Sequence, residues 1–425
     1  MIYNLLFLSK IFCFSVYEYI LYMLCINNYK TFINNILLRL IKGNVLFVKV
    51  FQSMCSNKYI SNEIKEFCNT NTNNVLYYEN EVDYNTLFYI VTKYKITLCQ
   101  PTPTNAGMIS LIYTGKMNNK KVIIKIKKLK IKEKMTFGFN NIVFLYNLLT
   151  MIYHFDFIYA FKSIQDSGEY LLSQCDFDQE IDMLRLNAGI NSKSSLSSQT
   201  IIPICYNKVE DCLKNTNFII MDFLDGKFSF DNTINCDDKL IYAKYFMKYV
   251  IEQYLISQYV HTDLHPGNVI YMKIDNELKL GIIDFGMVVK LTPTLKSTIL
   301  KIIDLVFMEE SNEINNYIPL INILVNDPLD IKLYDDTILN TMNDYFRGMF
   351  ALLKKGTMNE YELHLAIDKL TNITNKKNSF TPLFTQIMLS MSMTNSNIYS
   401  LLDNNIELFE ELFKQTIEEV LFDDT

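Results

Sequence analysis

The stretch that decides the interpretation of this chain reads Val260-His261-Thr262-Asp263-Leu264-His265-Pro266-Gly267-Asn268-Val269-Ile270-Tyr271. A second stretch follows it and reads Leu280-Gly281-Ile282-Ile283-Asp284-Phe285-Gly286. Two of the chain's 4 His fall within the first stretch. That concentration makes a solvated loop with incidental acids a poor explanation, because both halves occur together and in order.

Asp263, Asn268 and Asp284 form an ordered polar set between apolar runs. In a kinase site, the first Asp accepts the substrate hydroxyl proton or orients the nucleophile, and the Asn and second Asp hold magnesium. Carboxylate and amide oxygens suit Mg²⁺. Two β-like runs, 269–274 and 278–283, flank a turn expected at Asn276-Glu277. They predict a hairpin that returns Asp284 beside Asn268.

Length and composition limit the possible classes of protein. A chain of 425 residues exceeds one ordinary core, so two lobes are expected. A hydrophobic fraction of 49% is ample for burial. A net charge of −6 argues against a nucleic-acid partner. The 9 Cys contain no Cys-x-x-Cys, so neither a zinc site nor a disulfide framework is indicated, and a reducing compartment is the simpler interpretation.

The first 26 residues are strongly apolar, with Glu18 interrupting the only long run. No small residues of a signal-peptide cleavage site follow. A membrane helix needs ~20 apolar residues, and this stretch nearly qualifies. Two alternatives stay open, a membrane-inserted anchor and a packed or interfacial helix. The expected location is therefore intracellular, with membrane association through this segment.

Residues 33–51 and 82–94 are expected to be helical, with a possible break at Gly43 and Asn44. A strand at 108–114, a turn at 115–120 and a strand at 122–127 predict a hairpin. Lys125 lies on the second strand, where burial would be costly without an anion. A nucleotide phosphate and a helix Glu would supply that partner. The alternative is an edge strand whose lysines face water.

The segment 169–188 has a helical pattern and contains Glu180. Residues 218–226 are expected to form a strand that runs into a turn. In a kinase-like order this is the hinge, where the backbone of Met221, Asp222 and Phe223 would bind adenine. A long helix at 241–259 leads to the catalytic stretch, and the pattern from Thr294 onward is helical.

These residues resemble the UbiB-like, or aarF-domain (ADCK), family of atypical kinases over roughly residues 43–291. The family's catalytic loop reads His-Ala-Asp-x-His-Pro-Gly-Asn, matched by 261–268. Its Asp-Phe-Gly-Met motif matches 284–287. Its Lys-x-Gly-Gln motif, on a helix that folds over the site, is matched by Lys49-Val50-Phe51-Gln52.

The resemblance implies roles for further residues. Lys125 would bind phosphate, Glu180 would be its helix partner, and Asp176 would belong to the Glu-x-Asp element that anchors the lid. Ala106 and Gly107 would lie in the family's Ala-rich loop.

Two departures concern the lid. Phe51 replaces the motif Gly, and Gln174 replaces the Glu of Glu-x-Asp. Phe cannot occupy the space that Gly leaves, and one anchoring carboxylate is lost. We therefore expect a lid that packs apolar side inward and is held less tightly.

The sequence thus predicts an α+β, bilobal protein-kinase-like fold with an N-terminal helical extension. The expected domains are the extension at 1–98, the N-lobe at 99–226 and the C-lobe at 227–425. The expected cofactors are ATP and Mg²⁺, with Asp263 as base or orienter and Asn268 and Asp284 as metal ligands.

The leading functional hypothesis is an atypical kinase-like ATPase or phosphotransferase. The resemblance implies a link to membranes and to ubiquinone or other isoprenoid lipids. One alternative is a pseudokinase scaffold without turnover. Another is a small-molecule phosphotransferase of the aminoglycoside or choline kinase type, which also favours His-x-Asp-Leu-His.

Overall fold

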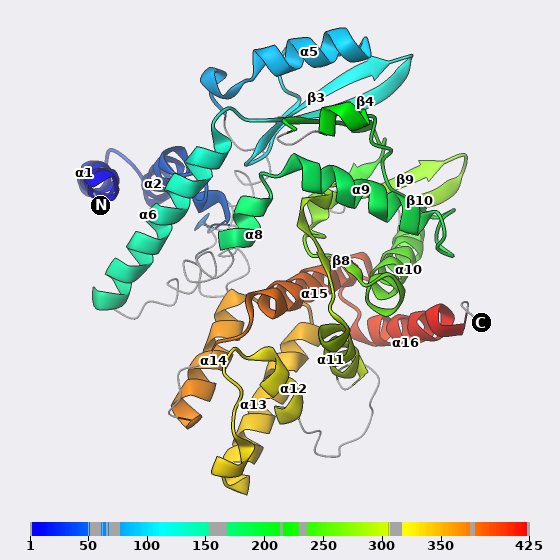
Figure 1. The fold of residues 1–425 in the computed structure, drawn as a ribbon. Coiled ribbons are helices and arrows are strands. Elements are labelled where there is room, and N and C mark those ends of the chain that lie inside the picture. The colour runs from blue at the N-terminus through cyan, green and yellow to red at the C-terminus, as the bar shows by residue number, and fades with distance from the viewer. Residues whose placement is uncertain are drawn as a thin grey trace. The chain divides into compact units, whose positions relative to one another are not determined.

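The computed structural model describes residues 2–49, 51, 61, 63–64, 67, 77–152, 168–212, 216–228, 236–304, 306, 317–374 and 379–422. The chain forms two compact units (Figure 1). The first comprises Met1–Asp178 and Tyr206–Met221, and the second comprises Gln179–Cys205 and Asp222–Thr425. The domain boundaries expected at residues 98 and 226 stay predictions.

The first unit contains a small sheet with strand order β1-β3-β4-β6, and β2 pairs with β3. The strands are β1 (Thr97–Leu98), β2 (Asn105–Ala106), β3 (Ser110–Met117), β4 (Lys120–Lys127) and β6 (Phe218–Asp222). The pairs that β3 makes with β1, β2 and β4 are antiparallel. Strand β4 lies between β3 and β6, so it is interior and the alternative of an edge strand is wrong.

The helix α5 (Tyr84–Tyr94) covers this sheet (Figure 1). It begins at Asp83, whose side chain accepts a hydrogen bond from Thr86 N at 3.0 Å. Apolar side chains of the helix, including Leu87 and Ile90, form one buried cluster with side chains of the sheet. This burial of apolar surface holds the sheet and the helix together.

The hairpin between β3 and β4 turns inside the predicted range 115–120, and β3 extends further than expected, to Met117. Asn118 and Asn119 have φ of 49° and 64°, the left-handed conformation of a two-residue hairpin turn. Gly115 lies inside β3 instead of in the turn. A Cβ on Gly115 would lie 2.6 Å from Ile96 Cγ2. Glycine at this position therefore lets the segment that precedes β1 pack closely against β3.

Besides α5, the helices in the described part of the first unit are α1 (Ile2–Met23), α2 (Tyr29–Gly43), α6 (Ile131–Ile152) and α8 (Gly168–Ser173). The helix expected at 33–51 is interrupted after Gly43. Asn44 leaves the helix, donates from Nδ2 to Gly138 O at 2.9 Å and accepts from Leu46 N at 3.0 Å. These bonds tie the end of α2 to α6.

The second unit contains two small sheets. The strands β5 (Thr200–Ile201), β10 (Glu277–Ile282), β9 (Val269–Ile274) and β7 (Lys227–Phe228) form one sheet in that order. The strands β8 (Tyr259–His261) and β11 (Val288–Lys290) form the other. The β9–β10 turn is at Asp275 and Asn276, with φ of 50° and 65°, one residue before the predicted position. Asp and Asn tolerate that conformation and Glu does not.

The rest of the second unit is mainly helical. Its helices are α9 (Phe177–Asn191, which begins at the end of the first unit), α10 (Cys236–Glu252), α11 (Pro293–Ile303), α12 (Ile318–Leu324), α13 (Asp336–Lys354), α14 (Glu360–Thr374), α15 (Pro382–Leu401) and α16 (Ile406–Phe422). The segment 169–188 is two helices, α8 and α9, separated at Gln174–Asp176. The predicted α+β class is confirmed.

Candidate active site

The catalytic stretch forms a closed loop between β8 and β9. Asn268 donates from Nδ2 to Asp263 O at 2.8 Å, and its backbone N–H donates to His265 O at 2.8 Å. His265 Nδ1 accepts from Gly267 N at 3.0 Å, which caps the short turn Pro266–Asn268. These bonds hold Asp263 and Asn268 in a fixed relation. They also turn the amide oxygen of Asn268 away from Asp263 O.

Asp284 follows β10 directly. Ile283 N donates to Asn268 O at 3.0 Å, so the hairpin returns the chain beside Asn268. Asp284 has φ of 62°, a conformation that is costly for a non-Gly residue and is typical of functional sites. Its Oδ1 accepts from Gly286 N at 3.3 Å, which fixes one carboxylate oxygen.

Glu180 of α9 lies near the same loop. A Cβ on Gly286 would lie 3.6 Å from Glu180 Oε2 and 3.3 Å from Asp284 Oδ1. Two carboxylates therefore border Gly286, and Glu180 is buried. A buried carboxylate needs a cation or hydrogen-bond donors, which is the environment expected for the helix Glu of a kinase-like site.

His261 is the buried support of the loop. Its Nδ1 accepts from Asp263 N at 3.2 Å, its Nε2 lies 3.4 Å from Ile283 O, and its ring packs on Phe285. Burial lowers the pKa of His261, although the charges of Asp263 and Asp284 oppose that effect. The side chain is therefore neutral, with Nε2 as the donor, and links the two motifs.

The helix α15 supplies three side chains that the sequence analysis missed. Gln386 Nε2 donates to Thr262 Oγ1 at 2.6 Å, Ser390 Oγ donates to His261 O at 3.4 Å, and Asn397 Nδ2 donates to Leu264 O at 2.8 Å. These residues lie on one face of the helix. Polar residues on a buried helix face were the available sequence signal.

Lys125 lies in the first unit on β4, with only 7% of its surface exposed. Its Nζ is 5.5 Å from the ring centroid of Phe177, and Lys127 Nζ is 4.9 Å from the same centroid. Burial lowers the pKa of Lys127. The sequence analysis did not select Lys127, which shares this cationic face of the strand.

The structure also describes the residues predicted for the Ala-rich loop and for the hinge. Ala106 is buried in β2, and Gly107 N donates to Ser110 O at 2.9 Å. Met221 and Asp222 end β6, and Phe223 follows. Asp222 N donates to Ile204 O at 3.2 Å, so that N–H is already engaged.

The lid residues are only partly described. Lys49 is half-buried. Phe51 is buried, with its ring centroid 5.8 Å from that of Phe47 and 6.3 Å from that of Phe67. Gln52 lies outside the described residues. Asp176 caps α9, accepting from Asp178 N at 3.1 Å. Closure of this segment over a nucleotide stays a prediction.

The donor set of Asn268 and Asp284 fits Mg²⁺. Within the described ranges, no group of three or more His, Cys, Asp and Glu side chains could hold a metal on its own. Mg²⁺ in phosphate sites uses one or two carboxylates with water and phosphate oxygens, so a small oxygen set is sufficient.

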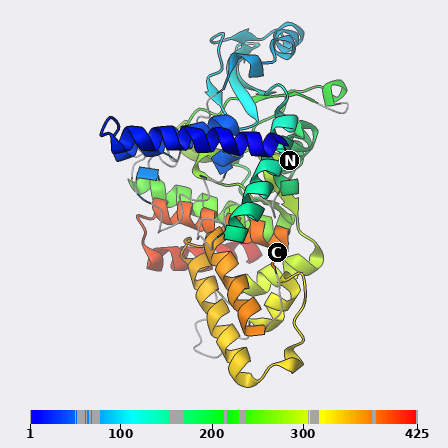
Figure 2. The same ribbon diagram turned by 90° about the vertical axis from the view of Figure 1, so that its left-hand side faces the viewer.

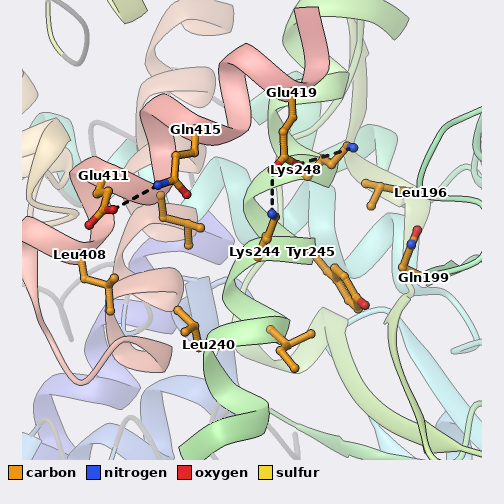
Figure 3. Close-up of a pocket in the computed structure, with 12 residues that line it drawn as sticks. Leu196, Gln199, Leu240, Lys244, Tyr245, Lys248, Leu408, Glu411, Gln415 and Glu419 are labelled. Carbon is orange, nitrogen blue, oxygen red and sulfur yellow. Dashed lines mark hydrogen bonds and ion pairs between the residues drawn. The ribbon is translucent and has the colours of Figure 1, made fainter. Parts of the chain in front are cut away.

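A cavity of about 640 Å³ lies elsewhere in the second unit, between α10 and α16 (Figure 3). Lys244 and Lys248 point toward Glu419, with Nζ–Oε distances of 2.6 Å and 3.9 Å. Its lining includes Leu196, Leu240 and Leu412, and no residue of the catalytic loop or of 284–287. This cavity is therefore separate from the loop chemistry.

Comparison with known proteins points to one family. The sequence model of the ABC1 atypical kinase-like domain matches residues 62–318, more than half of the chain. No curated protein sequence matches significantly.

Several solved structures are similar. They include the Rv3197–erythromycin complex from Mycobacterium tuberculosis (12% identity, 75% of this chain and 80% of that chain, TM-score 0.45). A Rio2 kinase–ADP/Mg²⁺–phosphoaspartate complex from Chaetomium thermophilum shows 12% identity over 62% and 81%, with a TM-score of 0.31. A MAP kinase from Leishmania major shows 11% identity over 79% and 98%, with a TM-score of 0.29. Because these scores lie below 0.5, the family match carries the assignment.

Proposed function

The chain belongs to the ABC1 atypical kinase-like family, the family of the UbiB/ADCK domain, and from that premise we propose that it binds ATP with Mg²⁺ and acts as an ATPase or phosphotransferase. The observation that carries the proposal is the bonded link between Asn268 and the Asp284 turn. That link brings two magnesium-type oxygen ligands together beside Asp263.

Each residue has a role in this proposal. Asn268 and Asp284 would hold Mg²⁺, which neutralises phosphate charge when bound. Asp263 would accept a proton from the attacking hydroxyl or orient water. Lys125 would bind phosphate, and Glu180 would orient Lys125. Ala106, Gly107 and the backbone of 221–223 would contact the nucleotide, and Lys49 and Gln52 would cover it, with Asp176 as the anchor of the lid.

The metal assignment is tested with Asp284→Asn. This variant should lose Mg²⁺-dependent ATP binding, because a carboxylate ligand is replaced by a neutral amide. Asp275→Asn is the matched control, since Asp275 is an exposed acid in the adjacent hairpin turn, where Asn is tolerated. ATP affinity measured by calorimetry with and without Mg²⁺ decides the result. Unchanged Mg²⁺-dependent affinity in Asp284→Asn would contradict the assignment.

Turnover separates an enzyme from a scaffold. Asp263→Asn should bind ATP almost normally and turn it over ~10²-fold or more slowly, the usual effect of losing a positioned acid–base group. A wild-type protein that binds Mg²⁺ and ATP without phosphate release or transfer would be a pseudokinase scaffold. The altered lid, in which a buried Phe51 stands at the motif Gly position, is the reason to retain the pseudokinase scaffold as a second candidate function. The match to the ABC1 family disfavours the aminoglycoside or choline kinase type.

A membrane link completes the proposal. The helix α1 contains a stretch, Leu6–Met23, that is long and apolar enough to cross a membrane and is only 11% buried. We propose that this segment brings the protein to a membrane, where an isoprenoid lipid such as a ubiquinone precursor would be the related substrate or ligand. Phosphate release measured with and without lipid vesicles tests this part.

A further inference from the structure

The helix α1 has two apolar faces, and one of them packs on the protein. Phe7 stacks on Phe47 with ring centroids 6.5 Å apart, and Tyr22 stacks on Phe32 at 5.5 Å. Arg39 of α2 lies over the Phe14 ring at 5.3 Å. These positions follow helical spacing, so the inner face of α1 is fixed against α2 and the segment after it.

Glu18 lies on this inner face and is only 4% exposed. Its Oε2 accepts from Asn27 Nδ2 at 3.1 Å and from Asn35 Nδ2 at 2.9 Å. Asn27 belongs to the turn between the helices and Asn35 belongs to α2. The two amides satisfy a carboxylate that lies within the apolar stretch, and they tie α1 to α2.

The outer face of α1 is exposed and uncharged. Phe12 is 69% exposed and Ile20 is 49% exposed, and Val16 and Met23 extend the same stripe. The only charged residues between 6 and 23 are Lys10 and Glu18, and Glu18 faces inward. Figure 2 shows the helix along its length. A continuous exposed apolar stripe of this length marks an interaction surface.

The charges around the stripe favour an anionic lipid surface over a neutral one. The helices α1 and α2 carry four basic residues, Lys10, Lys30, Arg39 and Lys42, and a single acid, the buried Glu18, whereas the whole chain has a net charge of −6. Exposed tyrosines, Tyr17, Tyr19 and Tyr29, border the stripe. Tyrosine side chains favour the boundary between headgroups and acyl chains, and basic residues are attracted to anionic headgroups.

We propose that α1 lies in the plane of an anionic bilayer, with its outer face in the lipid and its inner face still on α2, and does not span the membrane. Spanning would draw Glu18 into hydrocarbon and separate it from both amides, which is costly for a carboxylate. Lying flat keeps these bonds and buries only the outer stripe. The proposal rests on the membrane association proposed above and is independent of nucleotide binding.

Flotation of the full chain with vesicles tests the surface. Binding should be strong on vesicles of phosphatidylglycerol and phosphatidylcholine and weak on phosphatidylcholine alone. The double variant Phe12→Ser/Ile20→Ser should lower the partition coefficient about 100-fold, because two large apolar side chains no longer leave water. Phe88→Ser/Ile323→Ser is the matched control, with exposures of 74% and 48% on other helices, and should bind like wild type.

Two further readouts make the outcome decisive. Wild-type protein should be released from the vesicles by alkaline carbonate, whereas retention would show a spanning helix and overturn the proposal. An equal loss of vesicle binding in the control variant, or no binding of wild-type protein to anionic vesicles, would also overturn the proposal. The apolar stripe would then be better explained as a surface for a protein partner. ATP affinity of Phe12→Ser/Ile20→Ser should equal that of wild type. Failure of the membrane proposal is therefore distinguishable from failure of the nucleotide proposal.

Discussion

At the scale of single residues, His261 shows how a buried neutral group organises two charged motifs. Its ring nitrogens contact Asp263 N and Ile283 O, one residue before Asp284. Protonation of Nδ1 would remove the acceptor that Asp263 N uses. The loop geometry therefore depends on a histidine that stays uncharged, which is consistent with the lowered pKa of the buried ring.

This leads to a pH prediction. The folded pKa of His261 lies below its ordinary value of 6.5, so the unfolded state binds the proton first as pH falls. The free energy of unfolding should decrease as pH drops below about 6.5, and the loss should end below the folded pKa. His261→Phe keeps a ring against Phe285 but removes the titration. Urea unfolding between about pH 7.5 and about pH 5.5 should show a shallower pH dependence in the variant.

An equal pH dependence in both proteins would show that another group titrates.

At the scale of elements, α15 supports the loop between β8 and β9 through side-chain hydrogen bonds. Its side chains reach the loop at Thr262 and at the carbonyl oxygens of His261 and Leu264. Asn395 on the same helix points elsewhere, and donates to Leu353 O of α13 at 3.0 Å. Neighbouring asparagines therefore hold two different parts of the second unit, and they form a matched pair for mutation.

Asn397→Ala should cost about 1–3 kcal/mol of stability, because Leu264 O loses its buried donor. Asn395→Ala should cost a similar amount through Leu353 O. Only Asn397→Ala should reduce ATP turnover, by about tenfold or more, since a small displacement of the loop misplaces Asp263. Urea unfolding and phosphate-release assays on both variants measure the two effects. Equal effects of the two variants on turnover would contradict a positioning role for Asn397.

At the scale of the whole molecule, the residues proposed for nucleotide binding come from both compact units. Lys125 belongs to the first unit, and Asn268 and Asp284 belong to the second. Mg²⁺–ATP at ~100 times its Kd should stabilise the folded chain by about 2.7 kcal/mol.

Lys125→Met should abolish this thermal stabilisation by Mg²⁺–ATP, because the phosphate would lose its cation. Lys121→Met is the control, since Lys121 lies on the same strand and is exposed. Differential scanning calorimetry with ATP, with and without Mg²⁺, measures the shift in Tm. A full shift in Lys125→Met would place the phosphate-binding lysine elsewhere, and Lys127 on the same face would be the next candidate.

Structural features formed by residues that are close in sequence could be predicted. The hairpin from Val269 to Ile282 and the Asp263–Asn268 loop follow from local apolar patterning and turn chemistry. The β3–β4 turn at Asn118 and Asn119 lies inside the predicted turn 115–120, whereas the β9–β10 turn lies one residue earlier than predicted, because Asp275 and Asn276 take the left-handed positions. The family resemblance was confirmed by the match over residues 62–318. The individual roles of Lys49, Gln52 and Lys125 stay predictions.

The sequence by itself determined the fold class and the family, because these depend on residue types at short spacing, whereas the catalytic and metal roles of its motif residues stay predictions. Tertiary structure alone decided the support of the loop by α15, whose bonds to it join residues 124 to 133 positions apart. It also decided that Glu18 faces α2 and that Glu180 borders Gly286. The reason is physical: a side-chain amide or carboxylate can bond to many groups, and only the packing of distant segments selects which group comes within reach.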